Sequence, residues 1–203
     1  MKWNKSTATV FLVLACIGLV GVAKFYFFPH GFVGSKVGPR AQGNPNAEIK
    51  IVEFMDAQCG TCAEAAPILK NYLYTYPSKI YWEVKFYPLV KSHLYALKSA
   101  IYCECAARQN KFWPFFDAVL ENQKEWSQSQ DPDAIFMRFA NDAKLDPGVL
   151  KACVADDDAK RVVHDEADEA VKAGVRATPT FFVNGKIAVG PKGLQEELDP
   201  KLR

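Results

Sequence analysis

The sequence predicts an α/β layer fold in which helices cover one sheet. Three observations support this: two strand-like segments flank a helical one, a long helical stretch follows, and a β-hairpin comes near the C-terminus. The chain has 203 residues, which suits one compact domain with an appendage. Because 49% of the residues are hydrophobic, we expect a sizeable core.

The appendage is residues 1–29, which we interpret as a membrane anchor or signal sequence. Two lysines precede an apolar run from Thr9 to Phe28, and its length matches the ~20 residues of a spanning helix. Positive charge before the run predicts a single pass through a bacterial inner (cytoplasmic) membrane, with the domain on the periplasmic side. Cleavage after Ala23 and lipidation of Cys16 are alternatives. All three readings place the domain in an oxidising, extracytoplasmic space.

The domain is expected over residues 47–203, after a Gly-, Pro- and Asn-bearing linker at 30–46. Ile49–Met55 is mostly apolar on both faces, as a buried parallel strand is. Thr61–Tyr74 has helical periodicity, and Ile80–Tyr87 alternates like a strand with one better-covered face.

A helical insertion is predicted over about 92–174, between the second strand and the C-terminal hairpin. Its candidate helices are Leu94–Ala107, Phe112–Asn122, two segments opened by Asp131-Pro132 and Asp146-Pro147, and Ala159–Ala173. The hairpin strands, Thr180–Val183 and Lys186–Val189, are joined by Asn184-Gly185, a strong turn signal. A short final helix is expected around Leu194–Leu198.

A CxxC pair, Cys59 and Cys62, lies between the first strand and the helix. That position puts Cys59 at a helix N-terminus, where the dipole and free N–H groups favour the thiolate. The alternative is a zinc site, which needs four ligands. The histidines are isolated and no second CxxC exists, although Cys103 and Cys105 could complete four sulfurs. The strand–CxxC–helix context favours redox chemistry, with no metal and no cofactor.

Charge argues against nucleic acid as the main partner. The chain has 25 basic and 23 acidic residues, and four of the lysines lie before residue 40. The rest of the chain is therefore slightly acidic, without the basic surplus of a nucleic-acid-binding domain.

Several further motifs join the CxxC: Val52-Glu53-Phe54, Phe86-Tyr87-Pro88-Leu89, Lys111-Phe112-Trp113 and Ala177-Thr178-Pro179-Thr180. Together, from about Gly43 to Val189, they resemble the DsbA-like branch of the thioredoxin superfamily, particularly its membrane-anchored or secreted bacterial members. The resemblance implies a thioredoxin-like fold carrying the helical insertion.

The resemblance also implies roles for individual residues. Cys59 would be the exposed nucleophile that forms mixed disulfides, and Cys62 the buried resolving cysteine. Pro179 would be a cis-proline facing the disulfide, and Thr178 would offer backbone hydrogen bonds to a substrate; an ordinary trans proline is the alternative. Glu53 would be a buried acid that relays a proton, although a surface-facing strand position is also possible.

A second pair of cysteines stands where relatives often carry them. The resemblance implies a structural disulfide between Cys105 and Cys153, which leaves Cys103 as an odd thiol. The alternative is that all three are small buried hydrophobes. His93 is read as a polar residue near a helix start rather than a ligand.

The sequence thus favours an extracytoplasmic thiol–disulfide oxidoreductase that oxidises thiol-bearing exported proteins. Its electrons would pass to a membrane partner of the DsbB or VKOR type. The dipeptide between the cysteines is Gly60-Thr61, whereas strong oxidases of the family typically have Pro-His. A reductase or isomerase of the same fold is therefore an alternative, and a thiol-dependent metallochaperone or assembly factor is another.

Overall fold

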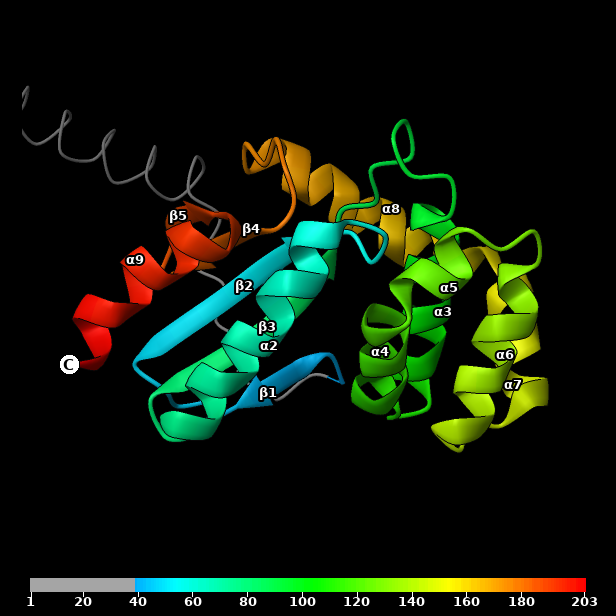
Figure 1. Ribbon diagram of the computed structural model, residues 1–203, viewed down its shortest axis with the longest axis horizontal. Coiled ribbons are helices and arrows are strands. Elements are labelled where there is room, and N and C mark those ends of the chain that lie inside the picture. The colour runs from blue at the N-terminus through cyan, green and yellow to red at the C-terminus, as the bar shows by residue number, and fades with distance from the viewer. Residues whose placement is uncertain (1–38) are drawn as a thin grey trace, which may run out of the picture. The chain divides into compact units, whose positions relative to one another are not determined.

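The computed structural model describes residues 39–203, which build a five-stranded sheet with helices packed against it (Figure 1). The predicted membrane segment at 1–29 lies outside the described residues. Within residues 39–203, no helix combines the length and the apolar composition needed to cross a membrane.

The sheet has the strand order β1-β3-β2-β4-β5. Its strands are β1 (Ala41–Gly43), β2 (Ile49–Met55), β3 (Ile80–Phe86), β4 (Thr180–Val183) and β5 (Lys186–Val189). Strand β2 is central, parallel to β3 and antiparallel to β4. Every residue of β2 except Lys50 is buried, because side chains pack on both faces of this strand.

Strand β1 lies within the predicted linker at 30–46, so the prediction is wrong for the last part of that segment. Ala41–Gly43 pairs antiparallel with β3, so the sheet begins before residue 47. Three residues are too few to show an alternating pattern. Gly43 has φ +92°, and a Cβ at this position would lie 2.2 Å from the carbonyl oxygen of Ile80. Only glycine fits so close an approach.

Helices α3 to α8 occupy the predicted insertion. The helices are α2 (Gly60–Thr75), α3 (Ala96–Arg108), α4 (Phe112–Glu121), α5 (Gln123–Ser127), α6 (Pro132–Asp142), α7 (Pro147–Ala155), α8 (Asp157–Lys172) and α9 (Gly190–Leu202). The carboxylates of Asp131 and Asp146 cap α6 and α7 by accepting from Ala134 N and Val149 N. These two helix starts confirm the Asp-Pro signals.

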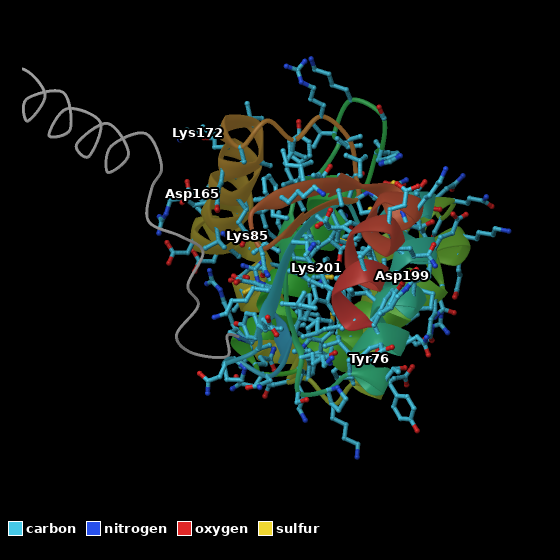
Figure 2. The ribbon with its side chains drawn as sticks, turned by 90° about the vertical axis from the view of Figure 1, so that its left-hand side faces the viewer. Tyr76, Lys85, Asp165, Lys172, Asp199 and Lys201 are labelled. Carbon is cyan, nitrogen blue, oxygen red and sulfur yellow. A yellow bond between two sulfur atoms is a disulfide. The ribbon has the colours of Figure 1, made fainter. Side chains whose placement is uncertain are left out.

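Helix α9 is longer than the predicted 194–198 segment. Pro191 stands in its first turn, where a missing N–H costs little. The hydroxyl of Tyr72 on α2 donates to Asp199, and Lys201 pairs with Glu197 within α9. Asp199 and Lys201 both project from α9 (Figure 2). Contacts with α2 therefore support a helix that is longer than the one its local sequence predicts.

Alternate residues of β2 face two different cores. Ile51 and Met55 belong to a large cluster that also includes side chains of α2 and the insertion. Val52 and Phe54 belong to a smaller cluster with Ala170 of α8. Glu53, which lies between Val52 and Phe54, therefore points toward the larger core, beneath α2.

The disulfide implied between Cys105 and Cys153 is present, and it joins α3 to α7. Cys105 is completely buried. Cys103 is a free, buried thiol, and its pKa is raised because it is removed from water. Since Cys105 is bonded to Cys153, the Cys103–Cys105 pair is not available to complete a zinc site with the CxxC.

Replacing both Cys105 and Cys153 by alanine should lower the free energy of unfolding by about 4 kcal/mol, because the bond closes a sequence separation of 48 residues. Urea denaturation of the full chain measures this change. Reductant should destabilise the wild type relative to the double variant by a similar amount, because both chains share the Cys59–Cys62 pair. An equal effect of reductant on the two chains would contradict the prediction.

Candidate active site

Cys59 lies at the point where β2 gives way to α2. It is the N-cap of α2, with extended backbone angles of φ −77° and ψ 120°. Its carbonyl accepts hydrogen bonds from Cys62 N at 3.1 Å and Ala63 N at 3.2 Å, which starts the helix. The sulfur of Cys59 therefore sits at the positive end of a 16-residue helix.

The two sulfurs of the CxxC have opposite environments. Both are free thiols; Cys59 is half-buried and Cys62 is completely buried. A hydrogen bond from Cys62 is the main cause that lowers the pKa of Cys59 to about 5. Burial raises the pKa of Cys62 well above its usual value, and the nearby Cys59 and Glu53 raise it further. At neutral pH the pair is one thiolate stabilised by one thiol.

Thr178 faces Cys59 from the loop before β4. The Thr178–Pro179 peptide bond is cis, as the resemblance implied. The Cys59 thiol donates to the Thr178 carbonyl oxygen at 3.4 Å. The Thr178 hydroxyl is buried and has no hydrogen-bond partner within residues 39–203. When Cys59 ionises, this hydroxyl can donate to the sulfur, which adds to the lowering of the Cys59 pKa by Cys62.

Glu53 lies on the side of β2 that faces the larger core. It is 2% exposed, so the surface-facing alternative is wrong. The indole N–H of Trp82 donates to its carboxylate at 3.0 Å. Burial raises the pKa of Glu53 to about 8, although the Trp82 hydrogen bond opposes the shift. The raised pKa of Glu53 therefore favours its protonated form at neutral pH.

Asp56 is a site residue that the sequence reasoning missed. Its carboxylate is fully buried and accepts from Gln58 N at 2.8 Å and Leu89 N at 2.9 Å. His93 Nδ1 lies 2.7 Å from the same carboxylate. His93 therefore does more than the polar helix-start residue that was expected, because it joins the loop before α3 to the CxxC turn. The sequence signal for Asp56 is its position, because an acidic residue directly after an apolar strand indicates a site residue.

Two glutamines also hold the turn of residues 56–59, which we call the redox turn. Gln58 accepts a hydrogen bond from Tyr95 N at 2.7 Å. Gln123, on α5 of the insertion, donates through Nε2 to Ala57 O at 2.9 Å and Cys59 O at 3.1 Å. No local pattern marks Gln123, which is 64 residues from Cys59 in sequence.

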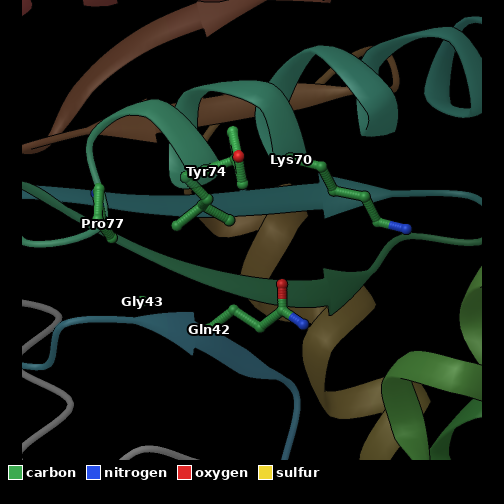
Figure 3. A pocket seen from close by; sticks show the side chains of 6 residues that line it. Gln42, Gly43, Lys70, Tyr74 and Pro77 are labelled. Carbon is green, nitrogen blue, oxygen red and sulfur yellow. The ribbon is translucent and has the colours of Figure 1, made fainter.

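A surface pocket of about 320 Å³ lies at the opposite end of α2 from Cys59 (Figure 3). Gln42, Gly43, Lys70, Tyr74 and Pro77 line it, and it shares no residue with the redox turn. Within residues 39–203, no three His, Cys, Asp or Glu side chains are grouped as metal ligands would be.

The fold and the paired sulfurs define a dithiol protein of the thioredoxin class. The chain belongs to the thioredoxin family: the family model described as "Thioredoxin" matches residues 35–199. Among its relatives is a protein named for disulfide bond formation, and among its structural neighbours is a DsbA protein.

The relatives carry two kinds of name. Disulfide bond formation protein D of Bacillus cereus is 28% identical over 154 residues, which are 72% of this chain and 70% of that protein. Na(+)/H(+) antiporter NhaA 3 of Salinispora tropica is 32% identical over 155 residues, 76% of this chain but 23% of the antiporter. This chain thus spans less than a quarter of that relative.

Solved structures share the fold at low sequence identity. BdbD from Bacillus subtilis has a TM-score of 0.71 and 20% identity, covering 85% of this chain and 96% of BdbD. The α-DsbA1 of Wolbachia pipientis has a TM-score of 0.64 and 22% identity, covering 79% of this chain and 89% of that one.

Glu53→Gln should remove a pH dependence of stability. The folded chain keeps the Glu53 proton up to a pKa of about 8, whereas the ordinary value is 4.5. Wild-type stability from this group is therefore complete below pH 4.5 and is lost as the pH rises toward 8. The variant lacks this loss, so its stability relative to wild type should increase across that range. The lowered pKa of Cys59 makes stability rise with pH instead, but the wild type and the variant share this effect.

Urea denaturation of both reduced chains at several pH values measures the difference. A constant difference between pH 4.5 and 8 would contradict the assignment of a raised Glu53 pKa.

Proposed function

We propose that this chain is an extracytoplasmic thiol–disulfide oxidoreductase that oxidises exported proteins through Cys59 and Cys62. The observation that carries the proposal is the opposite pKa shift of the two sulfurs. The pKa of the accessible Cys59 is lowered to about 5, while that of the buried Cys62 is raised. A stabilised thiolate favours the dithiol form, and a centre whose dithiol is favoured oxidises its clients.

The exchange begins with the Cys59–Cys62 disulfide. A client thiolate attacks the half-exposed sulfur of Cys59, so that a client–Cys59 disulfide forms and the bond to Cys62 breaks. Cys62 leaves as a thiolate and takes up a proton, because burial disfavours its charged form. Glu53, protonated at neutral pH and electrostatically coupled to Cys62, is the proposed proton donor.

The second step releases the oxidised client. A second client thiolate attacks the client sulfur of the mixed disulfide, and the client disulfide forms as Cys59 leaves. Cys59 is a good leaving group because its thiolate is stabilised by Cys62 and Thr178. Two electrons have then moved from the client to the Cys59–Cys62 pair. The extended client segment would lie along Thr178, beside Pro179.

The proposed location is the outer side of a bacterial cytoplasmic membrane, with residues 1–29 as a single-pass anchor. The Cys105–Cys153 disulfide supports this, since structural disulfides persist in oxidising compartments. A membrane protein of the DsbB or VKOR type would accept the electrons from the reduced pair. Gly60-Thr61, which departs from the Pro-His of strong oxidases, is the feature that favours the rival reductase or isomerase.

The reduction potential of the full chain, equilibrated with glutathione, should lie nearer the oxidising value of DsbA, about −120 mV, than that of thioredoxin, about −270 mV. Thiol alkylation and mass spectrometry would measure the fraction of chain with reduced Cys59 and Cys62. Cys59→Ser is the control and should show no such equilibrium. A value near that of thioredoxin would favour the reductase and overturn the proposed direction.

A further inference from the structure

Gln123 is the first residue of α5, a short helix anchored in the core of the insertion by Trp126. Trp126, one turn further along α5, is completely buried and donates through its indole N–H to Val119 O at 2.7 Å. Its ring centroid lies 5.2 Å from that of Phe136 on α6. A buried indole with a satisfied donor fixes a short helix firmly. The first residue of α5 therefore has a fixed position relative to the insertion.

The carboxamide of Gln123 binds two carbonyls of the redox turn, those of Ala57 and Cys59. Its NH₂ group has two hydrogens, and they satisfy Ala57 O and Cys59 O. Cys59 O already accepts from Cys62 N and Ala63 N, so three donors meet at this oxygen. One side chain thus contacts both the Ala57–Gln58 and the Cys59–Gly60 peptide groups.

Other contacts of the redox turn come from the segment before α3. Asp56 accepts from Leu89 N and approaches His93, and Gln58 accepts from Tyr95 N, all in the segment before α3. These contacts leave the carbonyls of the turn to other partners. Gln123 is the side chain that takes the carbonyls of Ala57 and Cys59.

The position of the Cys59 sulfur depends on this peptide geometry. The sulfur is stabilised by the Cys62 side chain first, then by Thr178 and the backbone N–H groups of Cys62 and Thr61. Those donors stabilise the sulfur only if the Cys59 backbone holds it among them, because hydrogen bonds weaken steeply with distance and angle.

We propose that Gln123 is a positioning residue that holds the Cys59 sulfur among its hydrogen-bond donors and thereby strengthens the oxidising power of the dithiol centre. The inference rests on the proposed function. It also assigns a chemical purpose to the insertion, which places an amide donor over the turn that carries the reactive sulfur. Without this donor, the Ala57 carbonyl loses its side-chain partner and the Cys59 carbonyl keeps only its helix partners. The redox turn is then held less firmly, the thiolate loses part of its stabilisation, and the dithiol form becomes less favoured.

Gln123→Met tests this inference, because methionine has a similar length and no N–H donor. The full chain is titrated by the ultraviolet absorbance of the thiolate and equilibrated with glutathione. The wild type should titrate near pH 5. The variant should titrate about one unit higher, and its equilibrium should shift about tenfold toward the disulfide form, which corresponds to about 30 mV. Gln128→Ala, at the exposed C-cap of the same helix, is the matched control and should behave as wild type.

Gln123→Ala provides a second variant, and thermal unfolding is recorded for each chain. A lower melting temperature with an unchanged thiolate titration and unchanged glutathione equilibrium would show a purely structural role. That result would overturn the inference and leave the proposed function intact. A wild type whose Cys59 titrates at the ordinary value and does not exchange with glutathione would overturn the proposed function, and the inference with it.

Discussion

The chemistry of the site depends on one interaction, the hydrogen bond between the thiol of Cys62 and the sulfur of Cys59 that lowers the pKa of Cys59. It requires the two sulfurs to be one helical turn apart, with one at the helix N-terminus and the other inside the core. The fold provides this arrangement by leaving four residues, 56–59, between the end of β2 and the start of α2. Burial keeps Cys62 protonated, and a protonated Cys62 is what stabilises Cys59 as a thiolate.

Hydrogen bonds from α5 of the helical insertion and from the loop before α3 hold the redox turn. Cys105–Cys153 ties α3 to α7, and a buried ion pair between Arg40 and Glu166 ties the start of the domain to α8. Glu166 also accepts from Phe86 N at 2.9 Å, at the end of β3. These contacts join the helices and strands around the sulfurs to one another. A site on a turn keeps its geometry when the surrounding elements are fixed in this way.

Much of the fold could be predicted from the sequence because its signals are local. The bounds of β2, β4 and β5 match the predicted ones, since alternation, apolar runs and Asn184-Gly185 are short-range patterns. Strand β1 could not be predicted, because three residues carry no pattern and depend on pairing with β3. The CxxC could be read directly, but Asp56 and Gln123 could not be linked to the segments they bind. Their partners lie 33 to 66 residues away in sequence, and only the folded chain brings them together.

The most direct test of the account is to trap the mixed disulfide. Cys62→Ser removes the resolving sulfur and keeps Cys59 at the accessible helix N-terminus. Incubated with a disulfide-bonded peptide, the full-length variant should form a stable peptide adduct, which mass spectrometry should locate at Cys59. Cys59→Ser should form no adduct under the same conditions, because Cys62 is buried. An adduct at Cys62 in Cys59→Ser, or none at Cys59 in Cys62→Ser, would contradict the account.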